Sequence, residues 1–193
     1  MHNVMLDLET MGNGPRAAIV SIGAVFFDPL TGELGAQFEA VIDLRNSAKY
    51  GEIDPDTVLW WLRQSDEARA QISGQGYVLL SEALWDLSSW ITKSCSLPNV
   101  KLWGNGASFD NVILRNAYEA TIKVAPWDYW NDRDVRTIVD LGRSLLGFDP
   151  KKELPFEGVR HSALDDAKHQ ARYVSAIYRR MLAAVNGCDM VRG

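Results

Sequence analysis

The chain has 193 residues, a net charge of −5 at pH 7 and 47% hydrophobic residues, which is typical of a globular protein with a sizeable core. Its acidity argues against a protein that holds nucleic acid by bulk electrostatics, although brief contact at a metal-filled site stays compatible with it. The sequence has no apolar run long enough for a membrane span and no signal-peptide pattern, so we expect no membrane partner. The two cysteines match neither a disulfide framework nor a zinc motif, and a cytoplasmic location is expected.

The first part of the chain predicts a three-stranded meander followed by helices. Apolar runs predict strands over 3–10, 17–28 and 34–44. Turn sequences over 12–16 and 28–33 separate them. A helix is expected from about residue 55, in DPDTVLWWLRQSDEARAQI. A second helix is expected in SEALWDLSSWI, with Ser81 as its N-cap.

The second part predicts alternating strands and helices. A short strand over 99–106 ends in glycines, and a helix over 108–120 follows with Ser108 as its cap. Further helices are expected over 133–146 and from about 162 to 184. A meander followed by alternating elements predicts a single α/β domain over residues 1–193, built on a mixed sheet.

The first strand contains two acidic residues within an apolar run, VMLDLET at 4–10. Because side chains two residues apart on a strand share a face, Asp7 and Glu9 converge on one spot. Two unpaired carboxylates in apolar surroundings would lose about several kcal/mol of hydration and repel each other. They could instead line a solvated strand face, but the flanking apolar residues favour a partner such as a divalent cation, for which carboxylate oxygens are good ligands.

Further acids and a histidine occur at functionally suggestive places. Asp110 follows a predicted strand–turn–helix junction in GNGASFDN, and Asp166 lies early in the last helix, five residues after His161 in HSALDDAKHQ. Each has a plainer interpretation when taken alone. An acid in a first helical turn interacts favourably with the helix dipole, and a lone histidine is most often a surface or capping residue.

Taken in order, these elements resemble the three motifs of the DEDD 3′–5′ exonucleases, in the DEDDh branch whose third motif carries a histidine. Asp7, Glu9 and Thr10 match the first motif, Asp110 the second, and His161 with Asp166 the third. Longer stretches, DLETMGNGPRAAIVSIGAVFFDP, DPDTVLWWLRQSDEARAQI and WNDRDVRTI, are similar to small phage and bacterial exonucleases of the exonuclease A type. The resemblance implies a ribonuclease H-like α/β fold, with a five-stranded mixed sheet flanked by helices.

The resemblance also implies a mechanism. Asp7, Glu9, Asp110 and Asp166 would hold two Mg²⁺ or Mn²⁺ ions, and His161 would be the general base, since a neutral imidazole can accept a proton near pH 7. The expected reaction is removal of nucleoside 5′-monophosphates from the free 3′ end of single-stranded DNA or RNA, with DNA favoured. The expected substrate-binding residues are Thr10, Met11, Trp61, Asn105, Phe109 and Arg136. Arg136 could contact a phosphate or instead pair with Asp134 or Asp140.

Aromatic residues add a second question about substrate contacts. Trp60 and Trp61 point about 100° apart on a helix, so only one of them is expected to face the core, and the other is a candidate for stacking on a base. Trp127, Tyr129 and Trp130 are interpreted as packing or dimer contacts. His2 and His169 lack the motif spacing and are interpreted as surface residues.

Other functions stay open at this point. A 3′–5′ exoribonuclease is the nearest alternative, because no residue identifies a 2′-hydroxyl contact. A phosphatase with an aspartyl nucleophile is more remote, since Glu9 stands where such an enzyme has its second aspartate. A non-catalytic nucleic-acid-binding accessory is a further alternative, and the resemblance also suggests a homodimer.

Overall fold

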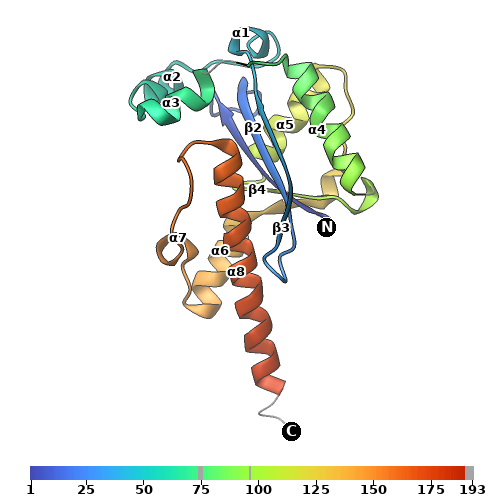
Figure 1. Ribbon diagram of the computed structural model, residues 1–193, viewed down its shortest axis with the longest axis vertical. Helices are drawn as coiled ribbons and strands as arrows, with labels where there is room; N and C mark the ends of the chain where they lie inside the picture. The colour runs from blue at the N-terminus through green and yellow to red at the C-terminus, as the bar shows by residue number, and fades with distance from the viewer. Residues whose placement is uncertain (74–75, 96, 190–193) are drawn as a thin grey trace.

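The computed structural model describes residues 1–73, 76–95 and 97–189, and its centre is a five-stranded sheet (Figure 1). The strands run in the spatial order β3-β2-β1-β4-β5, with bounds β1 (Asn3–Thr10), β2 (Ile19–Phe27), β3 (Leu34–Val41), β4 (Lys101–Gly104) and β5 (Asp132–Asp134). The first three strands pair antiparallel, while β4 pairs parallel to both β1 and β5. The five-stranded mixed sheet implied by the sequence resemblance is therefore confirmed.

Helices cover both faces of this sheet. Their bounds are α1 (Leu44–Ser47), α2 (Pro55–Leu62), α3 (Asp66–Ser73), α4 (Leu80–Ser94), α5 (Asp110–Ala120), α6 (Val135–Leu146), α7 (Pro150–Glu153) and α8 (Ala163–Asp189), with 3-10 turns η1 (Leu97–Asn99) and η2 (Tyr129–Asn131). In Figure 1, α4 and α5 lie to the right of the sheet, α6 and α7 lie to the lower left, and α8 extends well beyond the strands.

The alternation of β1 divides its side chains between two cores. Val4, Leu6 and Leu8 pack with α4 and α5 in one apolar cluster, whereas Met5 packs with α6 and α8 in another. Because successive side chains on a strand point to opposite faces, Asp7 and Glu9 share the α8 face with Met5. The register of the first strand thus directs both acids toward the last helix.

Gly23 on β2 allows the first turn of α8 to approach the sheet closely. Gly23 pairs with Asp7, and a Cβ atom at this glycine would lie 2.1 Å from the carbonyl carbon of Ala163. Only a residue without a Cβ fits such a backbone approach. The contact brings the start of α8, and with it Asp166, over the acidic end of β1.

Several predicted boundaries were wrong for local reasons. The helix expected from residue 55 divides into α2 and α3, since the Ser65 hydroxyl accepts a hydrogen bond from the Ala68 N–H and starts a new helix. α4 begins at Leu80 rather than after Ser81, because Glu82 accepts from the Leu79 N–H. The helix predicted over 133–146 begins only at Val135, because residues 132–134 pair with β4.

Two further sequence expectations concern the ends of the description. None of the helices in the described ranges is long and apolar enough to cross a membrane. The side chain of Cys188 lies outside the described part of the structure, so the expectation of no disulfide stays a prediction.

Candidate active site

Asp7 and Glu9 occupy the carboxyl-terminal half of β1, facing α8. Glu9 is buried, and the Asp7 Oδ1 atom accepts a hydrogen bond of 2.7 Å from Nε2 of Gln170 on α8. The two acids therefore lie between the central strand and the last helix, where apolar side chains fill the same face further along the sheet. This arrangement keeps the Glu9 carboxylate away from bulk water and leaves Asp7 half-buried.

Asp110 reaches the same place from the opposite side of the sheet's end. It is the first residue of α5 and is buried, and its Oδ1 atom accepts a 3.2 Å hydrogen bond from the Leu8 N–H of β1. The approach depends on Gly104 at the end of β4, where a Cβ atom would meet the Asp110 Cβ at 3.0 Å. Ser108 does not cap this helix, which follows Phe109 without a side-chain capping bond.

Asp166 and His161 complete the cluster from the start of α8. The Asp166 Oδ2 atom accepts a 2.8 Å hydrogen bond from the His161 N–H, so the motif spacing forms a closed turn. His161 has a φ of 63°, a left-handed conformation that is uncommon for residues other than glycine and is often retained at functional sites. Ligand atoms of Glu9, His161 and Asp166 all lie within 4.8 Å of one another, and this group could hold a metal ion.

The carboxylates oppose one another's ionisation. Burial raises the pKa of Asp7 well above its usual value, and the charges of its three acidic neighbours add to the effect. Burial, together with the charges of Asp166 and Asp110, raises the pKa of Glu9 to about 9. Burial also raises the pKa of Asp110 to about 7 and that of Asp166 above its usual value. Near neutral pH the cluster therefore holds protons that a divalent cation would displace, which is how a carboxylate metal site behaves without its ions.

Gln170 is a polar partner of this cluster that the sequence interpretation missed. It follows Asp166 by four residues on α8, so both side chains lie on one face of the helix. Its amide binds Asp7, and its hydrogen bond lowers the pKa of that acid against the effect of burial. The four-residue spacing after a motif aspartate was the signal that could have identified it.

The two adjacent tryptophans take different environments, as their helical spacing predicted. Trp61 is 4% exposed, and its Nε1–H donates a 3.0 Å hydrogen bond to the Thr10 carbonyl. Trp60 is 42% exposed, and its ring lies edge-on to His161 with the centroids 5.1 Å apart. The assignment of Trp61 to the substrate is therefore not supported, because its ring is enclosed in the protein. The open aromatic face beside His161 belongs to Trp60.

The remaining residues expected to contact substrate lie around the same cluster and differ in exposure and hydrogen bonding. The hydroxyl of Thr10 donates to the Gly12 carbonyl, while the Met11 N–H and C=O bond to Ala18 and Asp54. Phe109 is partly buried against the α4–α5 core. The exposed Arg136 is near enough to Asp110 to lower its pKa, and its guanidinium lies 3.0 Å from where a Cβ of Gly106 would be.

Two interpretations of other aromatic and histidine residues can be checked. His169 was expected at the surface, but it is 6% exposed because its ring packs between Phe156 and Tyr173, with centroids 4.8 and 4.4 Å away. Trp127 is buried in the α4–α5 core, whereas Tyr129 and Trp130 are exposed. The exposed His2 has a ring nitrogen 3.0 Å from Cys95 Sγ.

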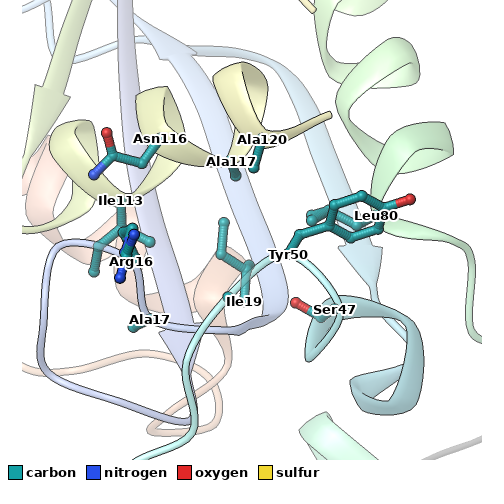
Figure 2. Close-up of a pocket in the computed structure, with 11 residues that line it drawn as sticks. Arg16, Ala17, Ile19, Ser47, Tyr50, Leu80, Ile113, Asn116, Ala117 and Ala120 are labelled. Carbon is teal, nitrogen blue, oxygen red and sulfur yellow. The ribbon is translucent and has the colours of Figure 1, made fainter. Parts of the chain in front are cut away.

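A separate small cavity lies away from the acids, between the start of β2, α5 and the loop after α1 (Figure 2). Its volume is about 30 Å³, and Ile19, Leu80 and Ile113 are among the apolar residues that line it. The buried Ser47 hydroxyl has no hydrogen-bond partner among the described residues. This space has room for about one water molecule and no acidic group, so it is not a second active-site candidate.

Comparisons with known proteins agree with this geometry. A family model described as the 3′–5′ exoribonuclease Rv2179c-like domain matches residues 2–178. An exodeoxyribonuclease of Enterobacteria phage T4 is 27% identical over 164 residues, covering 72% of this chain and 71% of the phage protein.

Solved structures share the fold. The nuclease domain of 3′hExo, described as a DEDDh family member and bound to rAMP, has a TM-score of 0.63 at 14% identity and covers 91% of this chain and 90% of its own. E. coli Exonuclease I in complex with a dT13 oligonucleotide has a TM-score of 0.63 at 16% identity, covering 95% of this chain and 42% of that one. The chain therefore belongs to the Rv2179c-like 3′–5′ exoribonuclease domain family, shares the ribonuclease H-like fold of the 3′hExo nuclease domain, and is a 3′–5′ exonuclease.

Proposed function

We propose that this exonuclease hydrolyses the terminal phosphodiester at a free 3′ end of single-stranded nucleic acid and releases nucleoside 5′-monophosphates. The observation that carries the proposal is the convergence of four carboxylates from β1, α5 and α8 beside one histidine. Among the described residues none of these four acids forms an ion pair, and such a concentration of carboxylates is unfavourable for a structural site. A divalent-metal site for phosphodiester hydrolysis accounts for all five residues.

Asp7, Glu9, Asp110 and Asp166 would hold two divalent cations, with Mg²⁺ or Mn²⁺ as the candidates, because hard cations prefer oxygen ligands. When bound, such ions stabilise negative charge on the phosphate and lower the pKa of water. The chain's part is to orient these ligands. The Leu8 N–H holds Asp110, the Gln170 amide holds Asp7, and the His161 N–H holds Asp166.

In this proposal, His161 accepts the proton of the attacking water at its imidazole nitrogen. The rings of Trp60 and Trp61, nearly perpendicular to the imidazole, restrict it at centroid distances of 5.1 and 6.0 Å. The carboxylates of Glu9 and Asp166, close to the same ring, would stabilise the imidazolium that forms. The histidine is thus held in place before substrate arrives.

Substrate contacts follow from what remains accessible around the cluster. Trp60 replaces Trp61 as the proposed stacking surface for a base, a contact worth about 1–3 kcal/mol. Arg136 is proposed to contact a phosphate, because its guanidinium forms no ion pair within the described ranges. Thr10, Met11, Asn105 and Phe109 are proposed to surround the 3′-terminal nucleotide.

DNA is the first substrate to test and RNA the second. The phage relative is named an exodeoxyribonuclease, which favours DNA, while the matching family is described as exoribonucleases, which favours RNA. A phosphatase with Asp7 as nucleophile is disfavoured, since it gives no role to Asp110, Asp166 and His161, which lie in the same cluster. A homodimer and a cytoplasmic location stay predictions, and light scattering of the purified chain tests the dimer.

The experiment uses one sequence as DNA and as RNA, labelled at either end, with Mg²⁺, Mn²⁺ or EDTA. Metal-dependent shortening from the 3′ end, with 5′-monophosphates as products, is the expected result. The relative rates of the two polymers decide the sugar preference. Internal cutting, or the absence of cleavage of either polymer in both metals, would contradict the proposed function.

A further inference from the structure

A polar cavity of about 260 Å³ lies next to the acidic cluster, between α7, the segment that leads into α8, and α8 itself. We call it the α7–α8 pocket, and six of the residues that line it carry the argument: Asn105, Lys151, Arg160, Asp166, His169 and Gln170. It adjoins the active site because Asp166 lines the pocket and Gln170, on its wall, also binds Asp7. A ligand in this pocket would therefore lie beside the reacting phosphate.

The wall of this pocket carries buried polar atoms that lack partners. Among the described residues, Asn105 Oδ1, His169 Nδ1 and Gln170 Oε1 have no hydrogen-bond partner. His169 and Gln170 are 6% and 5% exposed, so bulk water does not solvate most of either side chain. Buried polar groups in native proteins are nearly always hydrogen-bonded, so these three lining side chains have hydrogen-bonding capacity left for a polar ligand.

The mouth of the pocket carries positive charge. Lys151 on α7 and Arg160 before α8 are both exposed, and neither takes part in an ion pair within the described residues. Arg160 packs over the Phe156 ring at 4.9 Å, which holds its guanidinium near the pocket. Unpaired cations above a polar wall match a ligand with an anionic end and a hydrogen-bonding end.

We propose that the α7–α8 pocket binds one nucleotide unit, with its phosphate at Lys151 and Arg160 and the polar edge of its base or sugar at Asn105, His169 and Gln170. The proposal rests on the proposed exonuclease function. The volume is near the lower end of ligand pockets, about 300 Å³, which suits a single unit rather than several. The nucleotide would be either an internal unit of the bound strand or a released 5′-monophosphate, and the two sources share the same chemistry.

The decisive kinetic test compares Lys151→Ala with Lys152→Ala. Both lysines lie on α7 and are exposed, and both substitutions remove one positive charge, but only Lys151 lines the pocket. Loss of a charged phosphate contact should weaken binding about tenfold. If the pocket holds a unit of the strand, Lys151→Ala raises KM for oligonucleotides about tenfold. If it holds the released product, the same variant raises the inhibition constant of the 5′-monophosphate instead. Lys152→Ala should change neither value.

A second measurement needs no turnover. The chain has three histidines, so each imidazole can be followed by NMR and assigned by single substitution. Addition of a nucleoside 5′-monophosphate in EDTA should shift the His169 signals, and Lys151→Ala should reduce that shift while Lys152→Ala should not.

The two hypotheses fail in different ways. A parent protein that cleaves no oligonucleotide would contradict the proposed exonuclease function. A parent protein that cleaves, with equal kinetic constants for the two lysine variants and no shift at His169, would overturn the pocket alone.

Discussion

The two faces of β1 have opposite environments, because its apolar and acidic side chains alternate along the strand. Val4, Leu6 and Leu8 enter a continuous apolar core with α4 and α5, whereas the half-buried Asp7 and the buried Glu9 face α8. One face stabilises the fold by excluding water from apolar side chains. The other face holds carboxylates whose raised pKa values reflect the unfavourable loss of hydration of the charged form. Residues that stabilise the core and residues proposed for catalysis therefore alternate along one strand.

The largest expected effect is on activity at the polar face. His161→Asn should lower kcat by about 10²- to 10⁴-fold, because it removes the proposed base. Asparagine tolerates the left-handed backbone at this position, so the N–H bond to Asp166 should persist and the melting temperature should stay nearly constant. Single-turnover cleavage and calorimetry measure the two quantities. Full activity in this variant would show that the histidine acts only through its backbone.

The matching change on the apolar face is Leu6→Ala. Leu6 is fully buried between β1 and the α4–α5 layer, so the cavity left behind should reduce the free energy of unfolding by about 2–5 kcal/mol. Activity per folded molecule should change little, since the side chain points away from the acids. Denaturant unfolding, with cleavage assayed at low temperature, tests this. A large loss of kcat in folded protein would show that the two faces are not independent.

Metal and pH should act on the polar face alone. Between pH 4.5 and about 9, Glu9 keeps its proton in the folded chain and loses it in the unfolded chain, so without metal the stability should fall as pH rises through this window. Mn²⁺ at about 100 times its dissociation constant should restore about 2.7 kcal/mol by binding only the native state. Differential scanning calorimetry at pH 6 and 8 measures both effects.

Two substitutions sharpen this test. Glu9→Gln should flatten the fall in stability with pH, because its side chain does not ionise, and Asp110→Ala should reduce the shift produced by Mn²⁺. A melting temperature that does not respond to millimolar metal at either pH would contradict the metal site.

Gly23→Ala should reduce both the stability of the fold and the activity. Its Cβ would meet the Ala163 backbone, so α8 must move away from β2, with a loss of about 1–3 kcal/mol as in other overpacked sites. The same movement should separate Asp166 from Asp7 and lower both metal affinity and kcat. Ala24→Gly on the neighbouring, apolar-facing position serves as the control and should reduce stability without lowering kcat. Normal metal affinity in Gly23→Ala would show that the approach of α8 does not position Asp166.

Much of the site could be predicted from local patterns in the sequence. The apolar run around Asp7 and Glu9, the strand–turn–helix junction before Asp110 and the five-residue spacing from His161 to Asp166 each constrain only their own segment. Their order along the chain carried the family resemblance, which the matching of residues 2–178 confirms. Helix starts were harder to predict, because α4 begins where the Glu82 side chain accepts from the Leu79 N–H, and α5 begins at Asp110, whose carboxylate binds the β1 backbone and does not cap the helix.

The environment of individual aromatic and polar side chains depends on packing against residues that are distant in the sequence. Helical spacing showed that Trp60 and Trp61 differ, but not which one is buried, since that depends on packing against Ala18 and Val20 of the first hairpin. His169 had no motif spacing and became a core residue because Phe156 and Tyr173 fold around it.

The sequence by itself determined the fold class, the two acids on one face of the first strand and the identity of the five motif residues, because these depend on residue type and short-range spacing. Tertiary structure decided how close those residues come, which tryptophan stays open beside His161, and that Gln170 and the α7–α8 pocket adjoin the acids. The convergence of the acids depends on Gly23, which leaves room for the α8 backbone, and on Gly104, which leaves room for the side chains of Asp110 and Asn111. Such long-range contacts form only when the whole chain packs.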